Sequence, residues 1–289
     1  MAFEKPTKYY MALAKSNYLN KTMKKVTTPT ETITDQNGIL EAIREYYADL
    51  FSNKDHLLNS NLIDTTLDTV AIPKLSATQK FTLNKEFNLT ELSKALHKMK
   101  NNKTPGTDGF PADFYKVFWN KLKHIIMRAF QEFYRQGKMS ITARTGILTC
   151  LPKGNKPRDL LKNWRPLTML SVPYKLISST LASRIKPIIK DLIPPTQTGF
   201  VDGRFIGDTT RLIYDLIDVT NNKNITGLLM LIDFEKAFDS ISWNFMLKVL
   251  KKFQFGETFI NWIGILNNDV VSSILQYGHF SKNFKIKRG

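Results

Sequence analysis

The chain has 289 residues, with 42 Lys and Arg against 25 Asp and Glu, so its formal net charge is +17. Hydrophobic residues make up 42% of the chain, which is enough for a buried core and excludes whole-chain disorder. A single cysteine excludes a disulfide framework and a cysteine-based zinc site. A positive charge of this size indicates a polyanionic partner such as nucleic acid.

The most apolar stretch is Gly227–Ile232, far shorter than the roughly 20 residues that span a membrane. The first ten residues, MAFEKPTKYY, contain no hydrophobic signal core. We therefore expect a protein without a membrane partner, located inside the cell in the nucleus and cytoplasm. The sequence leaves the oligomeric state open.

The positive charge is concentrated between Lys100 and Arg165, where 14 Lys and Arg stand against four acidic residues, a local net charge of +10. Aromatic residues are interleaved in the same stretch, so it could neutralise phosphates and stack on bases. The alternative is that the rings are the buried face of an amphipathic helix. Phe114, Phe118 and Leu122 follow helical spacing, which favours a core position for most of the rings.

The first part of the chain predicts short elements around one clear helix. Periodicity and turn residues give the following expectations: a short helix at 8–20, strands at 22–28 and 32–35, a turn at Asp35–Gly38, a helix at 39–52, and a polar linker or extension at 53–87. Asn88 and Glu91 form a capping pair for a helix at 89–100. Turn-forming residues then fill Lys103–Gly109.

The rest of the chain alternates between helices and strands. We expect a long helix from Pro111 to Gln136, a strand at 147–151, a basic loop at 153–162, helices at 172–189 and 209–219, a buried strand at 227–232, helices at 243–253 and 258–266, and a hairpin of 270–276 with 280–286.

Asp233 follows the predicted buried strand directly and precedes a turn, in the segment Ile232-Asp-Phe-Glu-Lys-Ala-Phe-Asp239. A carboxylate at a strand end is held rigidly and can face a cleft, where it could bind Mg²⁺ for phosphoryl transfer. The alternative is that Asp233 is a turn or cap residue. Asp239 is interpreted as the cap of the next helix and Phe238, from pattern alone, as a core ring. The four histidines show no metal-ligand spacing.

Four segments together point to a known family. They are Lys103-Thr-Pro-Gly-Thr-Asp-Gly-Phe110, Leu151-Pro-Lys with Trp164-Arg-Pro-Leu167, Gln197-Thr-Gly-Phe-Val-Asp-Gly-Arg204, and the segment at 232–239. In this order the chain, from about Leu92 onward, resembles the reverse transcriptase of non-LTR (LINE-type) retrotransposons. Each segment is weak by itself, and the order and intervals make the set specific.

The resemblance implies an α+β, right-hand polymerase fold with mostly helical fingers, the first part of the palm and no thumb. It implies an N-terminal extension at 1–87, fingers at 88–225 and a partial palm at 226–289. The implied activity is RNA-directed DNA polymerisation, with an RNA template, a DNA primer and dNTPs as partners and Mg²⁺ in a two-metal site.

The resemblance also implies residue roles. Asp233 matches the first metal-binding carboxylate of the palm, and the backbone carbonyl of Phe234 is a further metal ligand. Phe238 matches the ring under the incoming sugar, which excludes a 2′-hydroxyl. Arg165 matches the fingers arginine that grips the triphosphate, a task that suits a planar guanidinium. The remaining implied contacts are Lys153 on the triphosphate, and Gly203 with Arg204 near the template or nucleotide.

The sequence departs from the family pattern at its end. The family has two further Asp in an Asp-Asp motif, whereas no Asp-Asp pair occurs in the 289 residues. We therefore expect a fragment that is inactive alone, with an incomplete palm sheet. The alternative function is a non-catalytic, maturase-like RNA-binding module or a decayed relic on the same fold.

Overall fold

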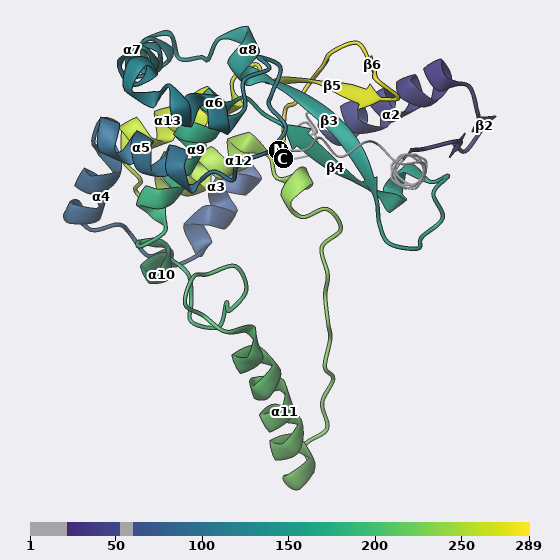
Figure 1. The fold of residues 1–289 in the computed structure, drawn as a ribbon. Helices are drawn as coiled ribbons and strands as arrows, with labels where there is room; N and C mark the ends of the chain where they lie inside the picture. Colours follow the sequence, from purple (N-terminus) through teal and green to yellow (C-terminus); the bar gives the residue numbers. More distant parts are fainter. Residues whose placement is uncertain (1–21, 53–59) are drawn as a thin grey trace, which may run out of the picture.

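A computed structural model of the chain describes residues 22–52 and 60–289. These residues form a helical body beside a five-stranded sheet, and helix α11 projects away from both (Figure 1). The combination of helices and sheet confirms the predicted α+β class at this coarse level. The helix predicted at 8–20 lies outside the described residues.

The N-terminal part contains a short ribbon and a helix. Strands β1 (Val26–Thr27) and β2 (Thr32–Ile33) pair antiparallel, within the two predicted strand segments. Helix α2 (Gln36–Leu50) follows, and the Asp35 carboxylate accepts a hydrogen bond of 2.6 Å from the Gly38 N–H. The predicted turn at 35–38 is therefore wrong, because Asp35 uses its side chain to cap the first turn of the helix.

The predicted polar linker is also wrong over its described part. Residues 60–84 contain helix α3 (Ser60–Thr69) and helix α4 (Ala77–Asn84). Lys248 and Lys252, on helix α12 (Trp243–Lys252), form ion pairs with Asp64 and Asp68 of α3. The lysines that form ion pairs with α3 thus lie 184 positions away in the sequence. The periodicity of residues 60–69 cannot indicate such distant partners.

The helical body is built from the middle and the end of the chain. Its further helices are α5 (Leu89–Lys98), α6 (Ala112–Val117), α7 (Trp119–Gln136), α8 (Ile141–Arg144), α9 (Val172–Ile185), α10 (Ile189–Leu192) and α13 (Glu257–Asn267). The Asn88–Glu91 capping box forms as predicted. The helix predicted from Pro111 to Gln136 is broken at Phe118, which leaves helical geometry (ψ 11°).

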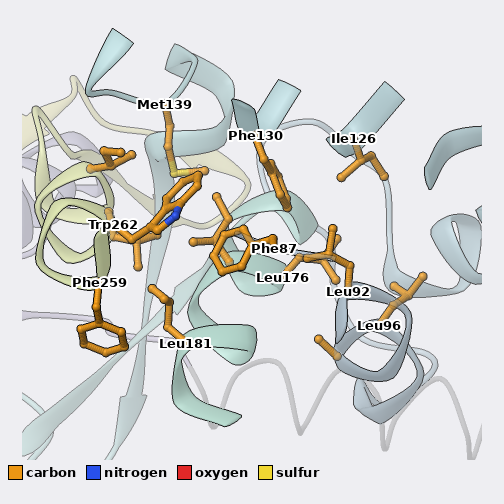
Figure 2. Packing of buried hydrophobic residues seen from close by; sticks show 14 of the residues in the cluster. Phe87, Leu92, Leu96, Ile126, Phe130, Met139, Leu176, Leu181, Phe259 and Trp262 are labelled. Carbon is orange, nitrogen blue, oxygen red and sulfur yellow. The ribbon is translucent and has the colours of Figure 1, made fainter. Parts of the chain in front are cut away.

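Aromatic rings fill the centre of this body (Figure 2). Phe87 stacks on Trp262 at 4.7 Å between centroids and meets Phe130 edge-on at 6.3 Å. Residues from α5, α7, α9 and α13 surround them, among them Leu92, Leu176 and Phe259. Most rings of the basic stretch thus lie in the core or against it, but the predicted face is shifted: Phe118 is 42% exposed, whereas Tyr115, Trp119 and Phe130 are buried.

The sheet joins distant parts of the chain. Its strands are β3 (Thr145–Pro152), β4 (Trp164–Met169), β5 (Val271–Gln276), β6 (His279–Phe280) and β7 (Phe284–Lys285). β3 pairs antiparallel with β4 and parallel with β5, and both β6 and β7 pair antiparallel with β5. The predicted C-terminal hairpin therefore forms, with its second strand divided in two.

Helix α2 covers one face of the sheet. Ile43 and Tyr47 are buried in one cluster with Leu148, Cys150 and Trp164 of the β3–β4 hairpin. Cys150 is the small buried residue that its apolar surroundings predict, and burial raises the pKa of its thiol to about 11. This packing fixes the N-terminal helix to the strands that carry two of the predicted site residues.

Helix α11 (Ile206–Asn222) has no buried residue. It points away from the body, and the chain returns from its far end through an extended segment (Figure 1). In the part of the chain that the structure describes, no helix combines the length and apolarity that crossing a membrane requires.

Candidate functional site

The β3–β4 hairpin places Arg165 and Lys153 on one face. Leu151 is the register partner of Arg165, and the Lys153 N–H donates to the Asn163 carbonyl at 2.9 Å. Side chains of paired residues share a face, and residues two apart on a strand share it too. Lys153 and Arg165 therefore lie on the face opposite to buried Cys150, which packs toward α2.

The two cations differ in how firmly they are held. The Lys153 ammonium donates to the Lys162 carbonyl at 2.7 Å, across the basic loop. The Arg165 side chain is exposed and has no hydrogen bond or ion pair within residues 22–52 and 60–289. A free guanidinium beside a partly held ammonium is suited to bind a phosphate group from solution.

The turn Lys103–Gly109 is a compact structure at the start of α9. The Thr107 hydroxyl donates to the Thr142 carbonyl at 3.0 Å, and the Gly109 N–H donates to the Gly106 carbonyl at 3.1 Å. Lys103 lines a cavity of about 270 Å³ together with Lys100 and Lys175. Burial lowers the pKa of Lys175, and the Asp108 carboxylate opposes that effect.

The buried strand predicted at Gly227–Ile232 is wrong. These residues form no strand, and Leu228 and Leu231 are 87% and 80% exposed. β4 is an end strand of the sheet, with only β3 beside it, yet the run does not pair with β4. The run therefore pairs with no strand of the described residues, and Asp233 lies in an exposed extended segment instead of at a strand end.

The turn after Asp233 meets another of the quoted segments. Phe238 is 70% exposed and contacts Phe200 edge-on, with 6.0 Å between ring centroids. Phe200 has a positive φ of 63°, and it belongs to the segment Gln197–Arg204. Phe238 is thus not a core ring, and the structure brings these two segments together at the surface.

Asp239 does not cap the following helix, which corrects that interpretation. Ser242 is the cap of α12, and its hydroxyl accepts a hydrogen bond of 3.3 Å from the Phe245 N–H. Asp239 is half-buried, and burial raises its pKa, whereas the nearby ammonium groups of Lys236 and Lys153 act to lower it.

Arg204 holds its own loop together. Its guanidinium donates to the carbonyls of Pro194 at 2.6 Å, Gln197 at 2.7 Å, Ile193 at 2.8 Å and Lys190 at 3.1 Å. These four hydrogen bonds give Arg204 a structural role in its own loop. Gly203 precedes it with φ 76°, a conformation that favours glycine.

The residues described do not form a metal site on their own. Asp233 and Phe234 are exposed, and no group of three His, Cys, Asp or Glu gathers anywhere in the described ranges. Mg²⁺ takes near-octahedral oxygen coordination and usually keeps several waters, so one carboxylate with one carbonyl can be only part of a two-metal site.

Comparisons with known proteins identify the family. Residues 151–285 match the model of the family described as Reverse transcriptase (RNA-dependent DNA polymerase). This range contains Lys153, Arg165, Arg204, Asp233 and Phe238. Residues 151–285 therefore belong to the reverse transcriptase family.

Three relatives show which branch of the family this is. The chain is 32% identical over 236 residues, 82% of its length, to the transposon TX1 uncharacterized 149 kDa protein of Xenopus laevis. It is 23% identical over 73% of its length to the Pol polyprotein of the type-1 retrotransposable element R1 of Bradysia coprophila, and 24% identical over 58% to the probable RNA-directed DNA polymerase from transposon BS of Drosophila melanogaster. The chain is thus similar to proteins of non-LTR retrotransposons, and the part that matches the reverse transcriptase family is residues 151–285. It spans 17%, 21% and 19% of the lengths of these relatives.

Lys236 has a contact that the sequence does not predict. Its ammonium donates to the Tyr46 hydroxyl at 2.6 Å, between segments 190 positions apart. Lys236 lies inside a quoted segment, but no pattern in the sequence indicates Tyr46 as its partner.

Proposed function

We propose that the chain is part of an RNA-directed DNA polymerase that, in the intact protein, adds dNTPs to a primer on an RNA template. The observation that carries this proposal is the family match over residues 151–285. That range includes the hairpin on which Arg165 and Lys153 share a face. The net charge of +17 is consistent with template and primer as polyanionic partners.

In this proposal residues 1–87 are an N-terminal extension, 88–225 are the fingers and 226–289 are a partial palm. The helices of the body come mainly from the fingers. The pairing of β3 with β5 makes the two regions share one sheet, so they would move together as a unit.

The proposed roles follow from where the side chains lie. Arg165 and Lys153 bind the triphosphate, because both are cations on one face of the hairpin. Phe238, an exposed ring, packs under the sugar and excludes a 2′-hydroxyl. Asp233 and the Phe234 carbonyl supply part of the oxygen ligands for Mg²⁺. Arg204 supports the loop near the template or nucleotide.

Nucleotide binding tests the proposed site directly. We expect Arg165→Ala to weaken binding of a fluorescent dTTP by about 10- to 150-fold, since a charge-assisted contact contributes about 1.5–3 kcal/mol. Arg211→Ala, which removes an exposed guanidinium from α11, is the matched control. Fluorescence anisotropy measures both. Equal dTTP binding by the wild type and Arg165→Ala would contradict the proposal.

Polymerisation by the chain itself is a separate question. With one metal-binding carboxylate and no Asp-Asp pair in the sequence, we propose that it does not polymerise alone. The assay is dTMP incorporation on poly(rA)/oligo(dT) with Mg²⁺, comparing the chain with Asp233→Ala. Incorporation that this substitution abolishes would show that the chain is active.

A non-catalytic, maturase-like RNA-binding module or a decayed relic is not favoured by the relatives. Measurements of dTTP binding and of RNA binding distinguish this alternative from a part of a polymerase. RNA binding without any dTTP binding would favour the module over the polymerase part.

A further inference from the structure

The turn that follows Asp233 has little local structure to hold it. Phe234 and Phe238 are 77% and 70% exposed, and the only regular element is a three-residue 3-10 helix, η3 (Phe238–Ser240). Within the turn, the Ser240 hydroxyl donates to the Lys236 carbonyl at 2.9 Å. The orientation of this segment must therefore come from contacts with other parts of the chain.

Lys236 makes such a contact. It is half-buried between exposed neighbours, and its ammonium donates to the Tyr46 hydroxyl at 2.6 Å. The same ammonium lies 4.8 Å from the centroid of the Tyr46 ring. The two distances together place the ammonium at the hydroxyl end of the ring, so Tyr46 binds the cation through its hydroxyl.

The backbone at Lys236 gives a second, independent observation. Its φ is 52°, in the left-handed region that residues other than glycine rarely adopt. Such a conformation persists only where surrounding contacts determine it. The anchored side chain of Lys236 is a contact of this kind.

Tyr46 is itself on a firm support. It lies on α2, whose Ile43 and Tyr47 are buried against the sheet, and its ring meets the Tyr47 ring edge-on at 5.1 Å. The support is thus the same hairpin that carries Lys153 and Arg165. An anchor on α2 fixes the turn relative to that hairpin.

We infer that Tyr46 is a positioning residue that holds the turn Asp233–Asp239 against the β3–β4 hairpin by binding the Lys236 ammonium. It lies outside the segment that matches the reverse transcriptase family, residues 151–285. As a claim about nucleotide binding, this inference rests on the proposed function. As a claim about the turn, it stands on the contact alone.

Trypsin cleavage after Lys236 measures the contact, because the protease must take the lysine side chain into its own pocket. In Tyr46→Leu, we expect cleavage after Lys236 to be about tenfold faster than in the wild type, because the hydrogen bond that holds the ammonium is lost. Tyr46→Phe removes the hydroxyl alone and should raise the rate by a similar factor. Cleavage after Lys223, at the end of α11, is the internal control. An unchanged rate after Lys236, or an equal rise after Lys223, would overturn the inference.

Nucleotide binding then tests the positioning role. We expect Tyr46→Leu and Lys236→Met to weaken binding of fluorescent dTTP by a similar factor, and the double variant to be no weaker than either alone. Lys236→Arg should keep most of the affinity, because a guanidinium can also donate a hydrogen bond to the Tyr46 hydroxyl. If the wild type binds dTTP but the Tyr46 and Lys236 variants bind equally well, the positioning role is wrong. If the wild type shows no Arg165-dependent binding, the proposed function fails instead, and the trypsin result still decides the contact.

Discussion

Arg184 is the residue with the most concentrated set of polar contacts in the body. It is 6% exposed, and its Nε and Nη2 donate to the two Glu91 carboxylate oxygens at 2.9 and 2.8 Å. It also donates to the carbonyls of Leu83, Lys85 and Glu86. One guanidinium therefore joins α9 to the loop between α4 and α5.

Replacing Arg184 should be costly for the fold. Arg184→Met leaves Glu91 and three carbonyls without their partner, so we expect the free energy of unfolding to fall by about 3 kcal/mol. Arg211→Met, which removes an exposed ion pair on α11, should change it by less than about 1 kcal/mol. Urea unfolding followed by circular dichroism compares the two. A similar decrease in the free energy of unfolding in both variants would show that the buried Arg184 contacts stabilise the fold no more than an exposed ion pair does.

The same ion pair predicts a pH dependence. Burial is the largest single effect and acts to raise the pKa of Glu91, but the hydrogen bond and the charge of Arg184, with the Asn88 N–H and Lys85, together outweigh it, and the net effect is a pKa below the usual 4.5. A carboxyl with a lowered pKa stabilises the fold above its unfolded-state pKa, and this stabilisation is lost as pH falls through the folded-state value. Between pH 7 and pH 3, the wild type should therefore lose more stability than Arg184→Met. Parallel pH profiles of the urea midpoint would contradict this.

Gly106 shows why the turn at 103–109 is restricted in sequence. A Cβ built there would lie 2.4 Å from the Ser171 backbone N and 2.7 Å from the Leu170 carbonyl carbon. Gly106→Ala should therefore destabilise the chain by about 1–3 kcal/mol, because backbone cannot move aside as a side chain can. Gly109→Ala, with φ 74° but open space, should lose only about 1–2 kcal/mol from the left-handed conformation. Thermal unfolding of the two variants compares the two losses; Ser76→Ala, which removes the hydroxyl that caps α4, serves as a reference.

At the scale of elements, local signals predict many of the helices and strands, whereas distant partners leave no local signal. Helix α4 is an exception, because its Ser76–Gln79 capping box is a local signal that the prediction of a linker or extension overlooks. The capping box of α5 and the strands β3 and β5 could be predicted because their sequence signals lie within a few residues. Helix α3 was missed because its ion pairs come from α12. The run Gly227–Ile232 has the composition of a buried strand, but composition cannot report whether the run pairs with a sheet edge. The same limit applies to Tyr46, whose partner is set by tertiary packing.

Helix α11 is predicted to be the least stable element. It has 17 residues, none of them buried, whereas most of the stability of helices in proteins comes from the packing of one face. We expect its amides to exchange with deuterium at least about 100-fold faster than those of α9, whose Leu176, Ile177 and Leu181 are buried. Hydrogen-exchange mass spectrometry measures both helices in one sample. Equal protection would mean that α11 is covered in solution.

The charge of the whole molecule leads to a prediction about RNA binding. The +10 stretch at 100–165 contributes Lys153 and Arg165 to the hairpin, and lysines to the cavity beside the turn at 103–109. If about five phosphates are neutralised, the affinity for a poly(rA) oligonucleotide should fall about 100-fold between 50 and 200 mM salt.

Where those contacts are made can be read from the slope of this salt dependence. The double substitution Lys153→Gln and Arg165→Gln should reduce the slope by about 1.4, since each lost contact to single-stranded RNA removes about 0.7. The matched control is Lys74→Gln with Lys80→Gln, which removes the same charge outside the +10 stretch. A global charge effect would lower both slopes equally, whereas RNA bound at the hairpin face lowers only the first. The salt titration therefore decides whether the +17 acts as a diffuse field or through the face that carries Arg165.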